Sequence, residues 1–187
     1  MASEKETYSI KQGWVTLAMV LLVSFIFGLV VLPRLDEKAS TRLEGEVASD
    51  FALPLLDGGE PGDRIRLSNL AGQVVVLDFW ATWCPPCLEQ IPILSQVAQA
   101  TEDAAVSVIG VNTGDSLQDA TRLLGKLRPL YPMLSDTDGT VAALYGVETL
   151  PTLIVVSPKG TIHAVRHGVQ DGRALRSLIQ SAASERR

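Results

Sequence analysis

The sequence lacks any block of basic residues. Its 16 lysines and arginines are scattered among 21 aspartates and glutamates, and the net charge is −5. Proteins that bind nucleic acid need a basic face with interleaved aromatic side chains, so the composition gives this function class little support. The chain also lacks internal repeats and low-complexity tracts. With 187 residues, we expect one globular domain plus an appendage.

Cysteine and histidine are scarce, with two of each. The cysteines, Cys84 and Cys87, have a spacing that suits either a disulfide or half of a zinc site. Tetrahedral zinc needs four ligands. The other candidate ligands, His163 and His167, lie on a late predicted strand, where alternation places both on one face. The two prolines between the cysteines also remove backbone donors and stiffen the turn, which disfavours a zinc site. We expect neither a metal nor a cofactor, and we interpret both histidines as ordinary strand residues.

Apolar residues are abundant, at 47% of the chain, and many of them lie together. The run Trp14–Leu32 contains no charge, and as a helix it would be about 28 Å long, close to the roughly 30 Å hydrocarbon core of a bilayer. The next residues, Pro33–Asp36, offer no small-x-small cleavage site, and a signal-peptide core is usually about 7–15 residues. A buried core helix is rarely apolar on every face. We therefore expect an uncleaved membrane anchor, although flanking charges do not fix its orientation.

The rest of the chain divides by composition. Residues 1–13 form a short polar tail, and the charged residues 33–47 read as a linker after the anchor at 14–32. Residues 48–187 are the expected globular domain. Within it, stretches with strand and helix periodicity alternate, which predicts an α/β fold with a mixed sheet.

The expected strands include a buried apolar run, a second buried strand, a late pair and a small entry hairpin: Val74–Trp80, Val106–Val111, Thr152–Val156 with Thr161–His167, and Asp50–Leu56 with Ile65–Leu67. The expected helices carry apolar residues at helical spacing: Glu89–Ala100, Leu117–Leu127, Asp138–Tyr145 and Arg173–Ala182.

The two cysteines lie between a buried strand and a helix. Cys84 falls at the helix start, where unpaired N–H groups and the helix dipole favour an anion by about 0.3–2 kcal/mol. That is enough to lower a thiol pKa by roughly one unit, and the thiolate is the attacking species in disulfide exchange. Cys87, one turn further on, would be the shielded resolving thiol. A purely structural disulfide is the alternative, but its short loop constrains the unfolded chain very little.

The segment Phe79–Cys87, which reads FWATWCPPC, resembles the active-site signature of the TlpA/ResA-like thioredoxin family of extracytoplasmic redoxins. The resemblance extends over about 48–182 and includes SDFALP at 49–54 and LSNLAG at 67–72. It implies a thioredoxin fold with an N-terminal β-hairpin and a central α/β insertion around residues 106–135, here preceded by one transmembrane helix. It also implies a bacterial inner-membrane protein that spans once, with its N-terminal tail in the cytoplasm and its catalytic domain in the periplasm.

The resemblance assigns further site residues. Leu150-Pro151 matches the family's cis-proline site, which faces the cysteines and pairs its main chain with an extended client. Trp83 is expected to flank the exposed sulfur, whereas Trp80 is expected in the core. Client proteins with disulfides or thiols and a membrane electron-donor reductase are the implied partners.

Asp78 interrupts the apolar strand, where a carboxylate is costly unless paired or protonated. It stands six residues before the first cysteine, as does the buried aspartate of thioredoxins proper. A raised pKa would suit it to take the proton of Cys87; the alternative is an aspartate at a solvated sheet edge. ResA-like members commonly carry a glutamate where this chain has Gln90, so the proton-handling role is expected to pass to Asp78.

These residues together predict a thiol–disulfide oxidoreductase that reduces client disulfides, with apocytochrome c as one implied client. An oxidant or isomerase would use the same residues, because direction depends on reduction potential. A thioredoxin-fold copper-binding assembly factor is the alternative from another class, although such proteins use a C-x-x-x-C spacing and a distant histidine. A peroxiredoxin would need a lone peroxidatic cysteine in a different context.

Overall fold

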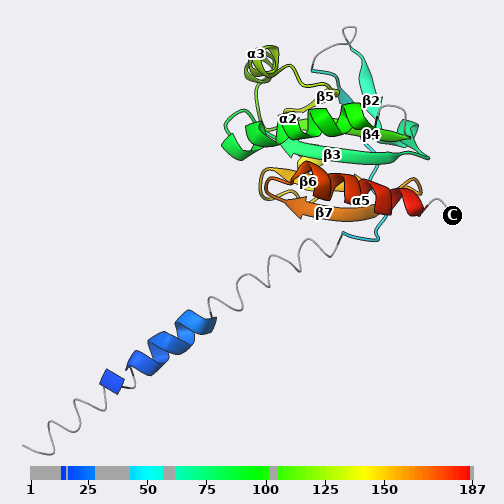
Figure 1. Cartoon of the computed structure of the whole chain (residues 1–187). Coiled ribbons are helices and arrows are strands. Elements are labelled where there is room, and N and C mark those ends of the chain that lie inside the picture. The colour runs from blue at the N-terminus through cyan, green and yellow to red at the C-terminus, as the bar shows by residue number, and fades with distance from the viewer. Residues whose placement is uncertain (1–13, 16, 28–42, 57–61, 102–104, 186–187) are drawn as a thin grey trace, which may run out of the picture. The chain divides into compact units, whose positions relative to one another are not determined.

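A computed structural model describes residues 14–15, 17–27, 43–56, 62–101 and 105–185 (Figure 1). Its contacts divide the chain into two compact units, Met1–Arg42 and Leu43–Arg187. In the first unit, residues 14–15 and 17–27 are helical. Among the described residues no helix has the length and apolar character to cross a membrane. The end of the expected anchor, residues 28–32, lies outside the described residues.

The second unit is built on a mixed five-stranded sheet in the order β5-β4-β3-β6-β7. Its strands are β3 (Val74–Trp80), β4 (Val106–Thr113), β5 (Met133–Asp136), β6 (Thr152–Val156) and β7 (Ile162–His167). Strand β4 runs parallel to both β3 and β5, whereas β6 is antiparallel to β3 and β7. The α-helices among the described residues of this unit are α2 (Pro85–Ala100), α3 (Leu117–Leu127), α4 (Thr140–Leu144) and α5 (Gly172–Ser184).

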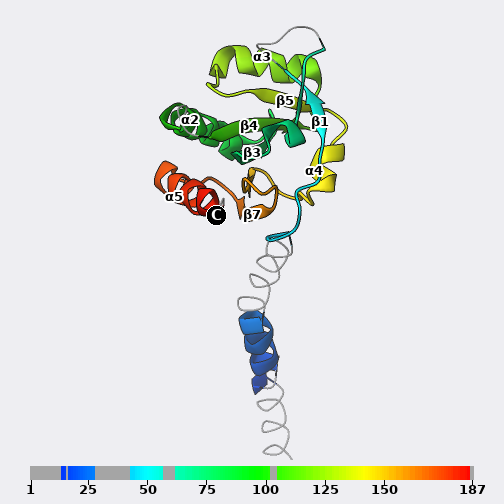
Figure 2. The ribbon, with the colours of Figure 1, turned by 90° about the vertical axis from the view of Figure 1, so that its right-hand side faces the viewer.

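Each face of the sheet is covered by a different set of elements. Figure 2 shows α2 and α5 on one face, and β1 (Ala52–Pro54) and α4 on the other. Side chains alternate along β3, so Val76 and Trp80 join the apolar cluster under α2 and α5, while Leu77 packs into the opposite cluster. The central strand is therefore buried on both faces, as its near-continuous apolar sequence predicts.

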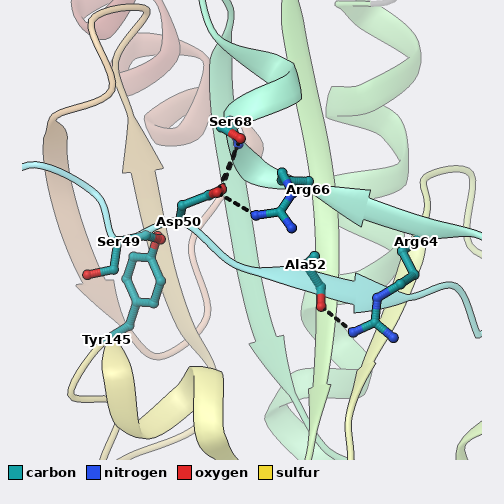
Figure 3. A network of polar contacts seen from close by, with 7 residues as sticks. All are labelled: Ser49, Asp50, Ala52, Arg64, Arg66, Ser68 and Tyr145. Carbon is teal, nitrogen blue, oxygen red and sulfur yellow. Dashed lines mark hydrogen bonds and ion pairs between the residues drawn. The ribbon is translucent and has the colours of Figure 1, made fainter.

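The entry hairpin is tied together by the carboxylate of Asp50, which precedes β1 (Figure 3). This carboxylate accepts hydrogen bonds from Arg66 at 2.8 Å and from the backbone N–H of Ser68 at 2.9 Å. Arg66 ends β2 (Arg64–Arg66), and Ser68 lies in the short 3-10 helix η1 (Leu67–Leu70). On the other side, the Tyr145 hydroxyl donates to the Ser49 carbonyl at 2.6 Å. The hairpin is thus fixed to the sheet face that does not carry α2.

Several elements differ from the sequence-based expectation. Helix α2 begins at Pro85 rather than Glu89, because proline suits the first turn, where its missing N–H leaves no bond unmade. Strand β5 was not expected, and α4 is shorter than the helix expected over Asp138–Tyr145. Residues 43–47, expected in the linker, belong to the compact unit. The backbone N–H of Gly45 donates to the carbonyl of Ile162 on β7 at 2.8 Å, which is why this segment packs on the sheet.

Candidate active site

The two cysteines lie at the start of α2, directly after the loop that leaves the carboxyl end of β3. Cys84 is the N-cap residue of the helix, and its sulfur accepts a hydrogen bond from the backbone N–H of Cys87 at 3.3 Å. The structure contains the Cys84–Cys87 disulfide, with a Cα–Cα distance of 5.3 Å. Residues 85 and 86 are prolines and carry no N–H, so the sulfur of Cys84 receives the N–H of Cys87 and lies at the positive end of the helix dipole.

The two tryptophans of the signature lie in opposite environments. Trp80 is fully buried in the apolar cluster that also contains both cysteines. Trp83 is 69% exposed, although it immediately precedes Cys84. Cys84 retains 4% exposure and Cys87 none. An exposed indole therefore stands at the more accessible cysteine, while the second cysteine is shielded.

Asp78 is completely buried, so the alternative of a solvated sheet edge is wrong. By alternation along β3 it lies on the same face as Val76 and Trp80, which is the face covered by α2 and the cysteines. Burial raises its pKa to about 7, and a hydrogen bond from Tyr131 partly opposes this rise. The other carboxylate oxygen, Oδ1, has no hydrogen-bond partner among the described residues. The carboxyl group can therefore exchange a proton near neutral pH.

Tyr131 is a site residue to which the sequence assigned no role. Its hydroxyl donates to Oδ2 of Asp78 at 3.1 Å, and burial together with the charge of Asp78 raises the pKa of this tyrosine well above its usual value. The phenol is thus a permanent donor at neutral pH. A buried aspartate implies some donor partner, but no local pattern identifies a residue so far along the chain.

The loop before Cys84 is held by a second carboxylate that the sequence did not single out. Asp115 is buried and follows β4. It accepts hydrogen bonds from the backbone N–H of Thr82 at 2.6 Å, the Thr82 hydroxyl at 3.0 Å and the Asn112 amide at 2.7 Å. Because Thr82 is two residues before Cys84, Asp115 fixes the backbone that leads into the disulfide.

The peptide bond between Leu150 and Pro151 is cis, as expected from the family resemblance. Leu150 is half-buried and packs against the apolar cluster that contains the cysteines. The Pro151 carbonyl accepts the backbone N–H of Gly168 at 2.9 Å. Strand β6 begins at Thr152, whose hydroxyl lies 2.8 Å from Nδ1 of His167. The backbone of Leu150 therefore lies just outside the sheet ladder.

Gln90 and His163 form hydrogen bonds away from the two cysteines. Gln90 is completely buried and bonds to the backbone of Gln170. His163 pairs with Glu185 at 2.5 Å, and this contact helps to hold the pKa of Glu185 below its usual value. Within the described residues no three histidine, cysteine or acidic side chains gather as a metal site would require.

Comparison with known proteins agrees with this geometry. Residues 45–165 match the AhpC/TSA family. The thiol-disulfide oxidoreductase ResA of Bacillus subtilis is 33% identical over 125 residues, covering 67% of this chain and 68% of that protein. The thiol:disulfide interchange protein DsbE of Xylella fastidiosa (strain Temecula1) is 30% identical over 153 residues, covering 76% of this chain and 75% of that protein.

A solved structure shares the architecture as well. The secreted disulfide oxidoreductase of Mycobacterium tuberculosis that is homologous to E. coli DsbE superposes with a TM-score of 0.61 and 27% identity, covering 70% of this chain and 95% of that one. The thioredoxin-like α/β fold, the Cys84–Cys87 disulfide at a helix start and these relatives lead to one assignment. The chain belongs to the AhpC/TSA family and is a thiol–disulfide oxidoreductase of the ResA/DsbE kind.

Proposed function

We propose that this oxidoreductase reduces disulfides of client proteins, with Cys84 as the attacking thiolate, Cys87 as the resolving thiol and Asp78 as the proton acceptor. One observation carries the assignment of roles. A fully buried carboxyl group with a pKa raised to about 7 lies on the sheet face that packs against the disulfide-bearing helix. A general base works best when its pKa is near the working pH.

The reaction balances as two successive thiol–disulfide exchanges. The Cys84 thiolate attacks one sulfur of the client disulfide, forms a mixed disulfide and releases the first client thiolate. Cys87 then gives its proton to Asp78 and attacks the sulfur of Cys84, which releases the second client thiolate. Two electrons pass to the client, and the enzyme is left with the Cys84–Cys87 disulfide that the structure contains.

Client binding is assigned to the side chain of Trp83 and to the backbone at Leu150-Pro151. Trp83 offers an exposed aromatic surface next to the attacking sulfur, and aromatic side chains contribute strongly to recognition. Leu150 precedes β6, so its main-chain groups are placed to pair with an extended client segment beside Pro151. This binding mode is sequence-tolerant, because main-chain hydrogen bonds supply the affinity.

The direction of electron flow and the location of the protein are part of the same proposal. The family resemblance supports reduction of apocytochrome c in the periplasm, with a membrane reductase that restores the dithiol. The uncharged run Trp14–Leu32 supports a single-pass anchor in the bacterial inner membrane, with residues 1–13 on the cytoplasmic side and the catalytic domain outside.

The test is the reduction potential of the Cys84–Cys87 couple combined with turnover of a disulfide peptide from apocytochrome c. We expect a potential in the range of about −200 to −270 mV, where glutaredoxins and thioredoxin lie. We also expect rapid reduction of the peptide by the dithiol form. A potential near the roughly −120 mV of a strong periplasmic oxidant, with the peptide oxidised rather than reduced, would contradict the reductant role.

A further inference from the structure

The side chain of Gln90 bonds through both of its polar atoms to the backbone of a single distant residue. Gln90 lies on α2, three residues past Cys87, and is completely buried. Its Oε1 accepts the backbone N–H of Gln170 at 2.6 Å, and its Nε2 donates to the backbone carbonyl of Gln170 at 3.3 Å. A primary amide provides an acceptor and a donor side by side, which matches these two backbone groups.

Gln170 continues the connection toward the cis-proline. It lies in the loop of residues 168–171 between β7 and α5. Its own side-chain amide donates to the carbonyls of His167 at 3.1 Å and Gly168 at 3.2 Å. The N–H of Gly168 in turn donates to the carbonyl of Pro151 at 2.9 Å. A continuous chain of hydrogen bonds therefore joins the helix that bears both cysteines to the segment before β6.

Close packing at the start of α5 supports the same connection. A Cβ atom added to Gly172 would lie 3.4 Å from a guanidinium nitrogen of Arg176 and 3.7 Å from a methyl carbon of Ile93 on α2. The end of the loop is therefore already in contact distance of α2. Packing sets the distance between loop and helix, while the two hydrogen bonds of Gln90 set the orientation of the Gln170 peptide.

We infer that Gln90 is a positioning residue: through Gln170 and Gly168 it holds the client-binding segment at Leu150-Pro151 in register with Cys84. This inference rests on the proposed role of that segment in client binding. Gln90 itself touches no client. Its loss leaves the partly buried N–H and carbonyl of Gln170 without these partners, so the loop should shift and the client should be presented less well.

The neutral amide makes this connection independent of pH. A glutamate at position 90 could accept from the Gln170 N–H when ionised, but its negative charge would then lie against the Gln170 carbonyl oxygen. When protonated, it could both donate and accept, as an amide does. Because position 90 is completely buried, desolvation should raise the pKa of a glutamate there above its usual value of about 4.3. A Gln90→Glu variant should therefore keep the connection at low pH and lose it at high pH.

Several charged or titratable groups face this region and shape that titration. By their place on the elements that pack together here, they are Glu89 on α2, Asp78 on β3, His167 at the end of β7, and Asp171, Arg173 and Arg176 at the start of α5. The pKa of Asp171 is lowered because its carboxylate accepts the backbone N–H groups of Ala174 and Arg173. Asp171 therefore stays ionised between pH 5.5 and pH 8.5. A pH-dependent difference between Gln90→Glu and the wild type cannot come from titration of Asp171.

The test compares KM and kcat for a disulfide peptide and for hydroxyethyl disulfide, at pH 5.5 and pH 8.5, in the full-length protein. Gln90→Leu should raise the peptide KM roughly tenfold at both pH values, the loss expected from two broken hydrogen bonds, while reduction of the small disulfide stays within about twofold. Gln90→Glu should match the wild type at pH 5.5 and approach Gln90→Leu at pH 8.5. Gln96→Glu, the same change at an exposed position of α2, should match the wild type throughout.

The backbone amide resonance of Gln170 provides a second readout that does not depend on turnover. It should lose its hydrogen-bond shift in Gln90→Leu and titrate with pH in Gln90→Glu. A normal peptide KM in Gln90→Leu, once this shift is lost, overturns the inference; so does equal impairment with the small disulfide. If Gln90→Leu fails to fold, the peptide KM of Gln90→Glu at pH 5.5 and pH 8.5 tests the inference by itself. An equal KM at the two pH values would then overturn it. Failure of the wild type to reduce either substrate would instead refute the proposed reductant function.

Discussion

The hydroxyl of Tyr131 donates a hydrogen bond to Oδ2 of Asp78 across 53 residues of sequence. Among the described residues it is the one hydrogen-bond partner of a carboxyl group that is completely buried and whose Oδ1 is unpaired. The hydrogen bond favours the ionised form, while burial favours the protonated form and is the larger effect. The balance leaves the pKa of Asp78 at about 7, and three predictions below depend on it.

The first prediction concerns the kinetics of Asp78→Asn. Because an amide cannot accept the proton of Cys87, collapse of the mixed disulfide should slow by roughly 10²-fold, the usual size of a general-base effect. The first attack by Cys84 should stay nearly normal. Stopped-flow reduction of a model disulfide separates the two phases. Resolution at the wild-type rate across pH 6–9 would remove Asp78 from the chemistry.

The second prediction concerns the stability of the same variant. The folded state keeps the proton of Asp78 up to a pH of about 7, whereas the unfolded chain loses it near pH 4. Between these values the unfolded state binds fewer protons, so the contribution of this group to stability is present at low pH and is lost as pH rises to about 7. Asp78→Asn should therefore be more stable than the wild type at pH 8, by up to about 4 kcal/mol, and gain little at pH 4. Denaturant melts at both pH values measure this, and a pH-independent difference would contradict it.

The third prediction concerns Tyr131→Phe. Removing the phenol removes the interaction that lowers the pKa of Asp78, so this pKa should rise further. The rising limb of the pH–rate profile for resolution should move to higher pH, with a loss of a few-fold at pH 7 that recovers at pH 9. Tyr145→Phe is the matched control, because Tyr145 bonds to Ser49 on the opposite face of the sheet. A profile that moves equally in both variants would point to a general structural effect.

The fourth prediction separates the two sulfurs. Cys84→Ser should abolish turnover, whereas Cys87→Ser should leave an attacking thiol that accumulates mixed disulfides with clients. The reason is the position of Cys84 at the helix N-cap and the complete burial of Cys87. Alkylation of the reduced protein at pH 6 should label Cys84 first. Preferential labelling of Cys87 would reverse the assignment.

The fifth prediction concerns the N-terminal segment. If Trp14–Leu32 is a retained anchor, the mature protein purified from membranes keeps its first residues. Intact-mass spectrometry should then give the full chain, apart from initiator methionine. A mature N-terminus near residue 40 would show a cleaved signal instead.

Much of the fold could be predicted because its signals are local. The strands Val74–Trp80 and Thr152–Val156 and the helix Leu117–Leu127 have the bounds that their residue patterns predicted. Strand β5 was missed, since its four residues, MLSD, carry no clear alternation. Its place depends on pairing with β4, where Gly110 lies opposite Met133, and such a long-range register is absent from the local pattern.

For the candidate site too, the features with a local signal could be predicted and those that depend on distant residues could not. The Cys84–Cys87 pair and the burial of Asp78 follow from neighbouring residues, so the sequence was enough to find them. The partners that hold the site come from elsewhere: Tyr131 reaches Asp78 from before β5, and Asp115 reaches Thr82 from after β4. A single sequence predicts that a buried carboxylate or an active-site loop needs hydrogen-bond partners, but it does not identify those partners.

The segment after residue 42 and the entry hairpin have a further consequence for an enzyme that exchanges disulfides with other proteins. Edge strands with open hydrogen-bonding groups recruit other chains and promote aggregation. Here Gly45 and Glu46 bond to Ile162 on the edge strand β7, and Leu56 bonds to Met133 on the opposite edge strand β5. Both borders of the sheet are thus partly occupied by the protein's own chain, which hinders their pairing with strands of other proteins.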